Sequence, residues 1–251
     1  TSLLLKIFRD TLFKIQILGI YPNCENNMQT LIVSATIFEI DKLIEDFEFI
    51  KIEENFYNKK IEKNSVDILV AGIGIAFTVY MLTKTLNKKN YDLILNIGIA
   101  GSFSDKLKIG DVVQVISEEF ADLGIRSKDS FSTLFDTGFI KANKFPFVDG
   151  RLKAANLKKQ LIPKIKQVNG ITVNTVNGNK KGIEELKKKF NADIESMEGA
   201  AVFYVCLMEK LAFTEIRSIS NYVEERNKEN WDIPLALSNL HLVIKKILSL
   251  I

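Results

Sequence analysis

The chain has 251 residues, 47% of them hydrophobic and 26% charged, proportions that predict one globular domain with a substantial buried core. Its 34 basic and 31 acidic residues give a net charge of +3, which is too even a balance for a nucleic-acid-binding surface. Two cysteines and one histidine are too few for a disulfide framework, a His-dependent triad or a His/Cys metal site, so no metal is expected.

Residues 1–20 are apolar but interrupted by charges, at Lys6, Arg9, Asp10 and Lys14. No uninterrupted run approaches the ~20 residues of a membrane span, and no secretory signal is evident. We expect residues 1–27 to be an extension, residues 28–251 to form the functional domain, and a peripheral membrane anchor to be the alternative. Cys206 lies in an apolar helical run, as expected for a reduced thiol of a cytoplasmic protein.

Short apolar runs alternate with helical patterns along the rest of the chain. Residues 118–150 lack periodicity and are expected to form a long functional loop. Alternating strands and helices predict an α/β layered fold. We expect strands at 31–35, 66–71, 91–97, 111–117, 171–176 and 212–220, and helices at 38–47, 75–86, 181–190, 199–210 and 234–250.

Polar residues stand where several of these elements begin or end. Glu198 opens an apolar helical run, and Asn221 follows the last strand. A carboxylate and an amide in such places suit the binding of a small polar ligand at the rim of an α/β sheet. The Gly72-Ile73-Gly74 turn is a weak dinucleotide signal, because Phe77 stands where a third glycine would be needed.

Four segments together resemble the nucleoside phosphorylase/nucleosidase superfamily: Ala35–Glu39, Asn96–Ser102, Glu195–Ala201 and Ser218–Asn221. The resemblance spans about residues 28–240. It implies a three-layer αβα fold with a mixed, curved central sheet. It also implies a small-molecule nucleoside substrate, no cofactor, no nucleic-acid or membrane partner, and a homodimer or higher homo-oligomer.

Cleavage of an N-glycosidic bond builds positive charge on the ribose and negative charge on the base, so the site needs groups that stabilise both. The resemblance implies that Glu198 anchors the ribose hydroxyls, that Met197 packs against the sugar, and that Glu39 activates water. Each glutamate could instead be an ordinary residue in the first turn of a helix. Between residues 28 and 57 the cations are only Lys42 and Lys51, which favours water over phosphate as the nucleophile.

Asn221 is the residue that indicates the base. Adenine-specific relatives carry Asp here, whereas an amide can donate to a 6-oxo group and still bond N7, so hypoxanthine is favoured. The alternative is an asparagine that only caps a strand. Further substrate contacts are implied for Ile73, Ala100, Gly101, Arg217 and Ser220, with Arg217 behind the base, and Phe120 and Phe145 are candidates for stacking on the base.

Within the superfamily, the futalosine hydrolases are most similar, through Phe120–Gly124, Ser196–Gly199 and Ser220–Glu224. That similarity implies hydrolysis of futalosine to hypoxanthine and dehypoxanthine futalosine in menaquinone biosynthesis. A methylthioadenosine/S-adenosylhomocysteine nucleosidase and a purine nucleoside phosphorylase are the enzyme alternatives. A catalytically inactive nucleoside-binding protein is the alternative from another class.

Overall fold

The computed structural model describes residues 27–128, 130–154, 165–225 and 227–249. The expected extension and Cys24 therefore lie outside the described residues, apart from Asn27. None of the described helices is long and apolar enough to cross a membrane.

Strands and helices alternate along most of the chain, as the sequence predicts. The strands are β1 (Gln29–Ser34), β2 (Ile50–Glu53), β3 (Phe56–Ile61), β4 (Asn64–Val70), β5 (Leu93–Ser102), β6 (Val112–Phe120), β7 (Gly124–Arg126), β8 (Phe131–Thr133), β9 (Phe147–Val148), β10 (Arg151–Lys153), β11 (Lys166–Thr172), β12 (Ile194–Ser196) and β13 (Phe213–Tyr222). The helices are α2 (Asp41–Phe47), α3 (Ile75–Leu86), α4 (Lys180–Lys189), α5 (Gly199–Met208) and α6 (Ile233–Leu248), with 3-10 turns η1 (Ile37–Glu39) and η2 (Lys228–Asn230).

The central sheet is mixed and closes on itself over part of its width. From one edge the order is β2, β3, β4, β1, β5, β12, β11, β6, β10 and β9, and β13 pairs with both β5 and β6. β13 runs parallel to β5 and antiparallel to β6. The strands β5, β12, β11, β6 and β13 thus form a ring, and this closure requires a strongly curved sheet.

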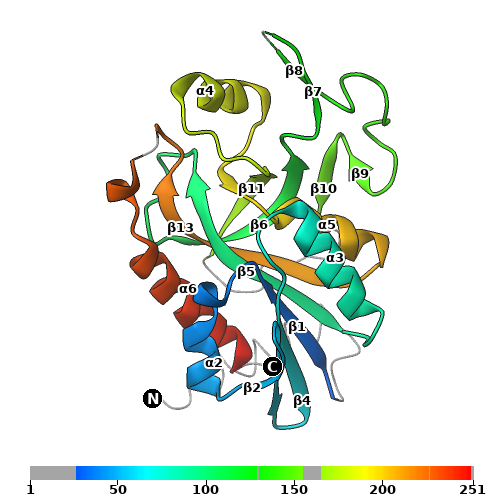
Figure 1. Cartoon of the computed structure of the whole chain (residues 1–251), viewed down its shortest axis with the longest axis vertical. Helices are drawn as coiled ribbons and strands as arrows, with labels where there is room; N and C mark the ends of the chain where they lie inside the picture. The colour runs from blue at the N-terminus through cyan, green and yellow to red at the C-terminus, as the bar shows by residue number, and fades with distance from the viewer. Residues whose placement is uncertain (1–26, 129, 155–164, 226, 250–251) are drawn as a thin grey trace, which may run out of the picture.

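Helices cover both faces of this sheet (Figure 1). On one face α3 and α5 lie side by side, over a cluster that includes Leu82, Phe203 and Ile94. On the other face α6 and α2 pack over a second cluster, which includes Leu43 and Leu240. These layers confirm the three-layer αβα fold with a mixed, curved sheet.

Several strand boundaries differ from the sequence prediction. β5 continues past the predicted end at Ile97 to Ser102, because both β12 and β13 pair with its second half. β13 likewise continues to Tyr222, so Asn221 lies inside a strand. β11 spans Lys166–Thr172 rather than 171–176.

Two further differences concern exposed parts of the chain. The hairpin of β2 and β3 is not among the predicted elements, and all four residues of β2 are exposed. Residues 118–150 are not wholly a loop: the first three belong to β6, and β7 pairs with β8 in a small hairpin beside α4 (Figure 1).

Candidate active site

Glu39 is fixed at the carboxyl end of β1. Its Oε2 accepts hydrogen bonds from the Ser34 hydroxyl at 2.8 Å and from the Thr36 backbone N–H at 3.0 Å, while Oε1 accepts from the Ile99 N–H at 3.1 Å. Thr36 and Glu39 form a capping box around η1, which fixes the backbone at this point. The carboxylate is therefore held between β1 and β5 with its two oxygens in defined positions.

Gly98 of β5 marks where Glu39 meets Arg217. A Cβ at Gly98 would collide with the Arg217 guanidinium and would lie 2.6 Å from Glu39 Oε1. Arg217 is 1% exposed, and its Nε donates to Glu215 Oε1 at 2.6 Å. Burial alone would lower the pKa of Arg217, but nearby carboxylates, Glu215 first among them, raise it. A permanent cation thus lies beside Glu39.

Glu198 lies at the start of α5, as its N-cap, and is 7% exposed. Its Oε1 accepts a hydrogen bond at 2.9 Å from the N–H of Gly74, the residue directly before α3. Burial raises the pKa of Glu198, while the Arg217 charge and the Gly74 bond oppose the shift. The Arg217 charge and the Gly74 bond each stabilise the anion, whereas the negative charges of Glu39 and Glu215 raise the pKa further.

The amides at the start of α5 are satisfied without Glu198. The Gly199 N–H donates to the Ser196 hydroxyl at 3.2 Å, and the Ala200 N–H donates to Thr172 Oγ1 at 2.7 Å. The Glu198 side chain makes no capping hydrogen bond to its own helix. Its carboxylate is therefore directed away from α5, toward Gly74.

Asn221 lies next to Gly101, where β13 is irregular. The register between β13 and β5 shifts between Ile219 and Asn221, leaving Asn221 opposite Gly101. Asn221 Nδ2 would lie 3.2 Å from a Cβ at Gly101. Its Oδ1 accepts from the Ser220 hydroxyl at 2.8 Å, and that hydroxyl also approaches the Ala100 carbonyl at 3.3 Å. The structure thus brings Ala100, Gly101, Ser220 and Asn221 together.

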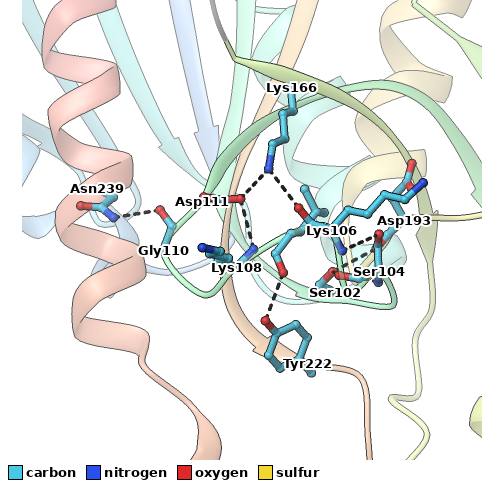
Figure 2. Close-up of polar contacts among 11 residues, drawn as sticks. Ser102, Ser104, Lys106, Lys108, Gly110, Asp111, Lys166, Asp193, Tyr222 and Asn239 are labelled. Atoms are coloured by element: carbon cyan, nitrogen blue, oxygen red, sulfur yellow. Dashed lines mark hydrogen bonds and ion pairs between the residues drawn. The ribbon is translucent and has the colours of Figure 1, made fainter.

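The segment that follows Ser102 is held by contacts from three other elements (Figure 2). The Tyr222 hydroxyl donates to the Leu107 carbonyl at 3.1 Å, and Asn239 of α6 donates to the Gly110 carbonyl at 2.8 Å. Lys166 Nζ bonds both the Lys106 carbonyl and the Asp111 carboxylate, each at 3.0 Å. These bonds anchor the ends of β5 and β13, where Gly101 and Asn221 lie.

The remaining candidates are two residues next to Gly74 and Glu198 in the chain and two phenylalanines. Ile73 is 54% exposed beside Gly74, and Met197 is half-buried directly before Glu198. Phe120 packs edge-on against Tyr204, with ring centroids 6.3 Å apart. Phe145 is 63% exposed.

Sequence reasoning missed three buried carboxylates near this region: Glu118, Glu195 and Glu215. Glu118 and Glu215 are both 0% exposed, and Glu215 Oε1 would lie 2.8 Å from a Cβ at Gly199. The signal for them in the sequence is an acidic residue inside an apolar strand run, as in Phe213–Ile219. In the described residues, no cluster of three or more His, Cys, Asp or Glu could hold a metal ion.

Comparison with known proteins gives a consistent family. The phosphorylase superfamily model matches residues 29–250. A futalosine hydrolase from Acidothermus cellulolyticus is 31% identical over 221 residues, covering 85% of this chain and 88% of the relative. A 5'-methylthioadenosine/S-adenosylhomocysteine nucleosidase from Bacillus subtilis is 28% identical, covering 88% and 98%.

The fold agrees with that relationship. The native structure of futalosine hydrolase from Helicobacter pylori has a TM-score of 0.73 and 20% sequence identity, covering 89% of this chain and 98% of that one. A nucleosidase from Colwellia psychrerythraea, solved in complex with adenine, has a TM-score of 0.72 over 90% of this chain and 96% of that one. The chain belongs to the phosphorylase superfamily.

Proposed function

We propose that the chain hydrolyses the N-glycosidic bond of futalosine, releasing hypoxanthine and dehypoxanthine futalosine in menaquinone biosynthesis. One observation carries the proposal: two carboxylates lie near one buried arginine. Glu39 and Arg217 lie next to each other at Gly98, and Glu198, bound to the Gly74 N–H, is close enough to raise the pKa of Arg217. The choice of futalosine as the substrate rests on relatives named futalosine hydrolase, which are 28–31% identical to this chain.

The reaction needs one group that activates water and one that stabilises the cationic sugar, and the site has a carboxylate for each. Glu39 keeps a hydrogen-bonded, half-buried position from which it can accept a proton from water, as a general base must. Glu198 is buried, and in its ionised form it can accept hydrogen bonds from two vicinal ribose hydroxyls. Those bonds strengthen as the sugar becomes cationic, so they stabilise the transition state more than the ground state.

Water is the nucleophile that this site favours. A phosphate would need cations or several N–H donors next to the sugar. Among the described residues, the cation that lies beside Glu39 is Arg217, whose Nε is engaged by Glu215. A single arginine surrounded by carboxylates is a poor site for a dianion. Hydrolysis is therefore favoured over phosphorolysis.

The base is held by Asn221 in this proposal. Its amide can donate to O6 of a 6-oxopurine and lies beside Gly101, where this amide and a Val223 methyl group occupy the place of a side chain. Its present bonds to Ser220 and to the Tyr222 carbonyl keep the amide in one orientation. An amide placed in this way would favour hypoxanthine over adenine.

We propose in addition that the enzyme is a homodimer or higher homo-oligomer in the cytoplasm. Large apolar side chains stand exposed next to the site segments: Phe38 at 71%, Ile73 at 54% and Phe77 at 65%. A second copy covering them would remove this apolar surface from water. Light scattering on the purified chain should give at least twice the monomer mass, and a monomer would contradict this part.

A substrate panel tests the activity. Purine release from futalosine, inosine and methylthioadenosine should be compared as kcat/KM. The variant Glu39→Gln removes the proposed general base, and Glu45→Gln, at an exposed position of α2, is the matched control. We expect futalosine to be the best substrate and Glu39→Gln to lose ~10²-fold or more. A preference for methylthioadenosine would replace futalosine by the nucleosidase alternative, and binding without cleavage would indicate a nucleoside-binding protein.

A further inference from the structure

Three neighbouring strands place Asn221, Gly101 and Glu195 in one row across the sheet. Asn221 of β13 pairs with Gly101 of β5, and Gly101 pairs on its other side with Glu195 of β12. Residues directly opposite each other on paired strands point to the same face. Because Asn221 Nδ2 lies 3.2 Å from the Cβ position of Gly101, Glu195 points to the face that carries the Asn221 amide.

The middle of this row has no side chain. Neighbouring strands lie about 4.8 Å apart, so the Cα atoms of Asn221 and Glu195 are about 10 Å apart. A methyl group of Val223 would lie 2.9 Å from a Cβ at Gly101, which supplies an apolar contact there. An amide and a carboxyl thus lie on either side of an apolar contact made by Val223, an arrangement that can meet the polar edge of a flat heterocycle.

Glu195 has a buried oxygen that nothing satisfies. The residue is 5% exposed, and Oε2 has no hydrogen-bond partner among the described residues. A buried carboxyl oxygen without a partner has lost its hydration and gains no hydrogen bond in return. Such a group is retained at a cost to stability, and a polar ligand would supply the missing partner.

We propose that Glu195 reads N1 of the purine base and, with Asn221, decides between 6-oxo and 6-amino purines. This inference rests on the proposed nucleosidase function and deepens it. A 6-oxopurine carries a proton on N1 and needs an acceptor there, whereas N1 of a 6-aminopurine is itself an acceptor. An ionised Glu195 therefore pairs with hypoxanthine, and a protonated Glu195 pairs with adenine.

The surroundings of Glu195 make this choice depend on pH. Burial, with the negative charge of Asp122, raises the pKa of Glu195 to about 7. Its partners on β5 and β11, Gly101 and Ile171, carry no charge. Below pH 7 the carboxyl is mainly a donor, and above pH 7 it is mainly an acceptor. Selectivity for a 6-oxopurine should therefore rise with pH.

The test is the ratio of kcat/KM for futalosine to that for aminofutalosine, its 6-amino analogue, from about pH 6 to about pH 8. Effects on water activation or ribose binding are common to both substrates and cancel in this ratio. We expect the ratio to rise at least tenfold in the parent enzyme, because Glu195 changes from mostly protonated to mostly ionised. Glu195→Gln cannot titrate and should give a flat profile.

Two further variants separate this role from a structural one. Asp122→Asn removes the neighbouring charge and should move the midpoint of the profile to lower pH. Glu119→Gln removes another carboxyl whose pKa burial raises, but one that pairs with Arg151, and it should leave the profile unchanged. A parent profile that is flat, or one that Glu195→Gln does not flatten, would overturn the assignment.

Binding of the free bases keeps this proposal separate from the proposed activity. Calorimetry with hypoxanthine and adenine, on the parent and Glu195→Gln, needs no cleavage. If futalosine is not cleaved but the ratio of the two Kd values still changes with pH through Glu195, the role of Glu195 stands and the substrate is wrong. If the Kd ratio is the same in both proteins at every pH, Glu195 does not read the base.

Discussion

The protonation state of Glu198 should control the acid side of the enzyme's pH profile. Burial raises its pKa above that of an ordinary glutamate. The ionised form accepts charge-assisted bonds at both oxygens, one from each of two ribose hydroxyls. As pH falls through this raised value, the anion is lost and kcat/KM should fall with it. Measured with futalosine, the acid limb should have a midpoint above the ~4.3 of a free glutamate.

The matching variant is Glu198→Gln, which keeps the shape of the side chain and removes the charge. We expect kcat/KM to fall ~10²-fold or more, because a charge-assisted contact that strengthens in the transition state is lost. Melting temperature serves as the control for folding. Activity within a few-fold of the parent would exclude Glu198 from the site.

Among single residues, the motifs alone select Glu39, Glu198 and Asn221. They do not select Glu118, Glu195 and Glu215. An acidic residue in a strand run looks the same whether its side chain points to solvent or to the interior. Only the pairing of β12 and β13 with β5 shows that Glu195 and Asn221 share a face.

At the level of elements, strand β5 is the support on which the site is built. Gly98→Ala should push the Arg217 guanidinium away from Glu39, since the added methyl would occupy its place. We expect kcat to fall at least tenfold, while KM changes little because the ribose and base contacts lie elsewhere. Steady-state kinetics on the purified variant measures both constants.

The comparison variant is Gly138→Ala, which adds a methyl where nothing lies within 4 Å, at a φ of +75°. Strain at this φ should lower its melting temperature, but kcat should stay at the parent value. Equal losses of kcat in the two variants would show that Gly98 acts through general stability and not through Arg217.

The sequence predicts the helices to within a few residues, whereas it misplaces several strand ends. The periodicity of α3, α4 and α6 is a local property of the chain. The ends of β5, β11 and β13 depend on partner strands that are distant in sequence, such as β12 for β5. This is why the sequence pattern ends β5 at Ile97, before the glycines that form the site.

For the molecule as a whole, Glu118 makes stability depend on pH. Burial and the neighbouring Glu215 raise its pKa well above the ordinary value. The folded chain then holds a proton that the unfolded chain releases above about pH 4.3. The contribution of Glu118 to the free energy of unfolding is therefore fully present below that pH. It decreases as the pH rises toward the pKa of Glu118 in the folded chain.

Glu118→Gln removes this titration and keeps an acceptor for the Thr172 hydroxyl, which donates to Glu118 Oε2 at 2.8 Å. Between about pH 5 and about pH 8, the melting temperature of the variant should fall less than that of the parent. Glu184→Gln, at an exposed position of α4, should follow the parent. A variant whose melting temperature changes with pH as the parent's does would mean that Glu118 is ionised in the fold.

The cluster of Glu39, Arg217 and Glu198 should direct water, and not phosphate, to the sugar of futalosine. The most direct measurement is mass spectrometry of the products formed by the full chain, with and without saturating phosphate. We predict hypoxanthine and free dehypoxanthine futalosine in equal amounts, at a rate that phosphate does not increase. A phosphorylated sugar product, or cleavage that requires phosphate, would contradict the account.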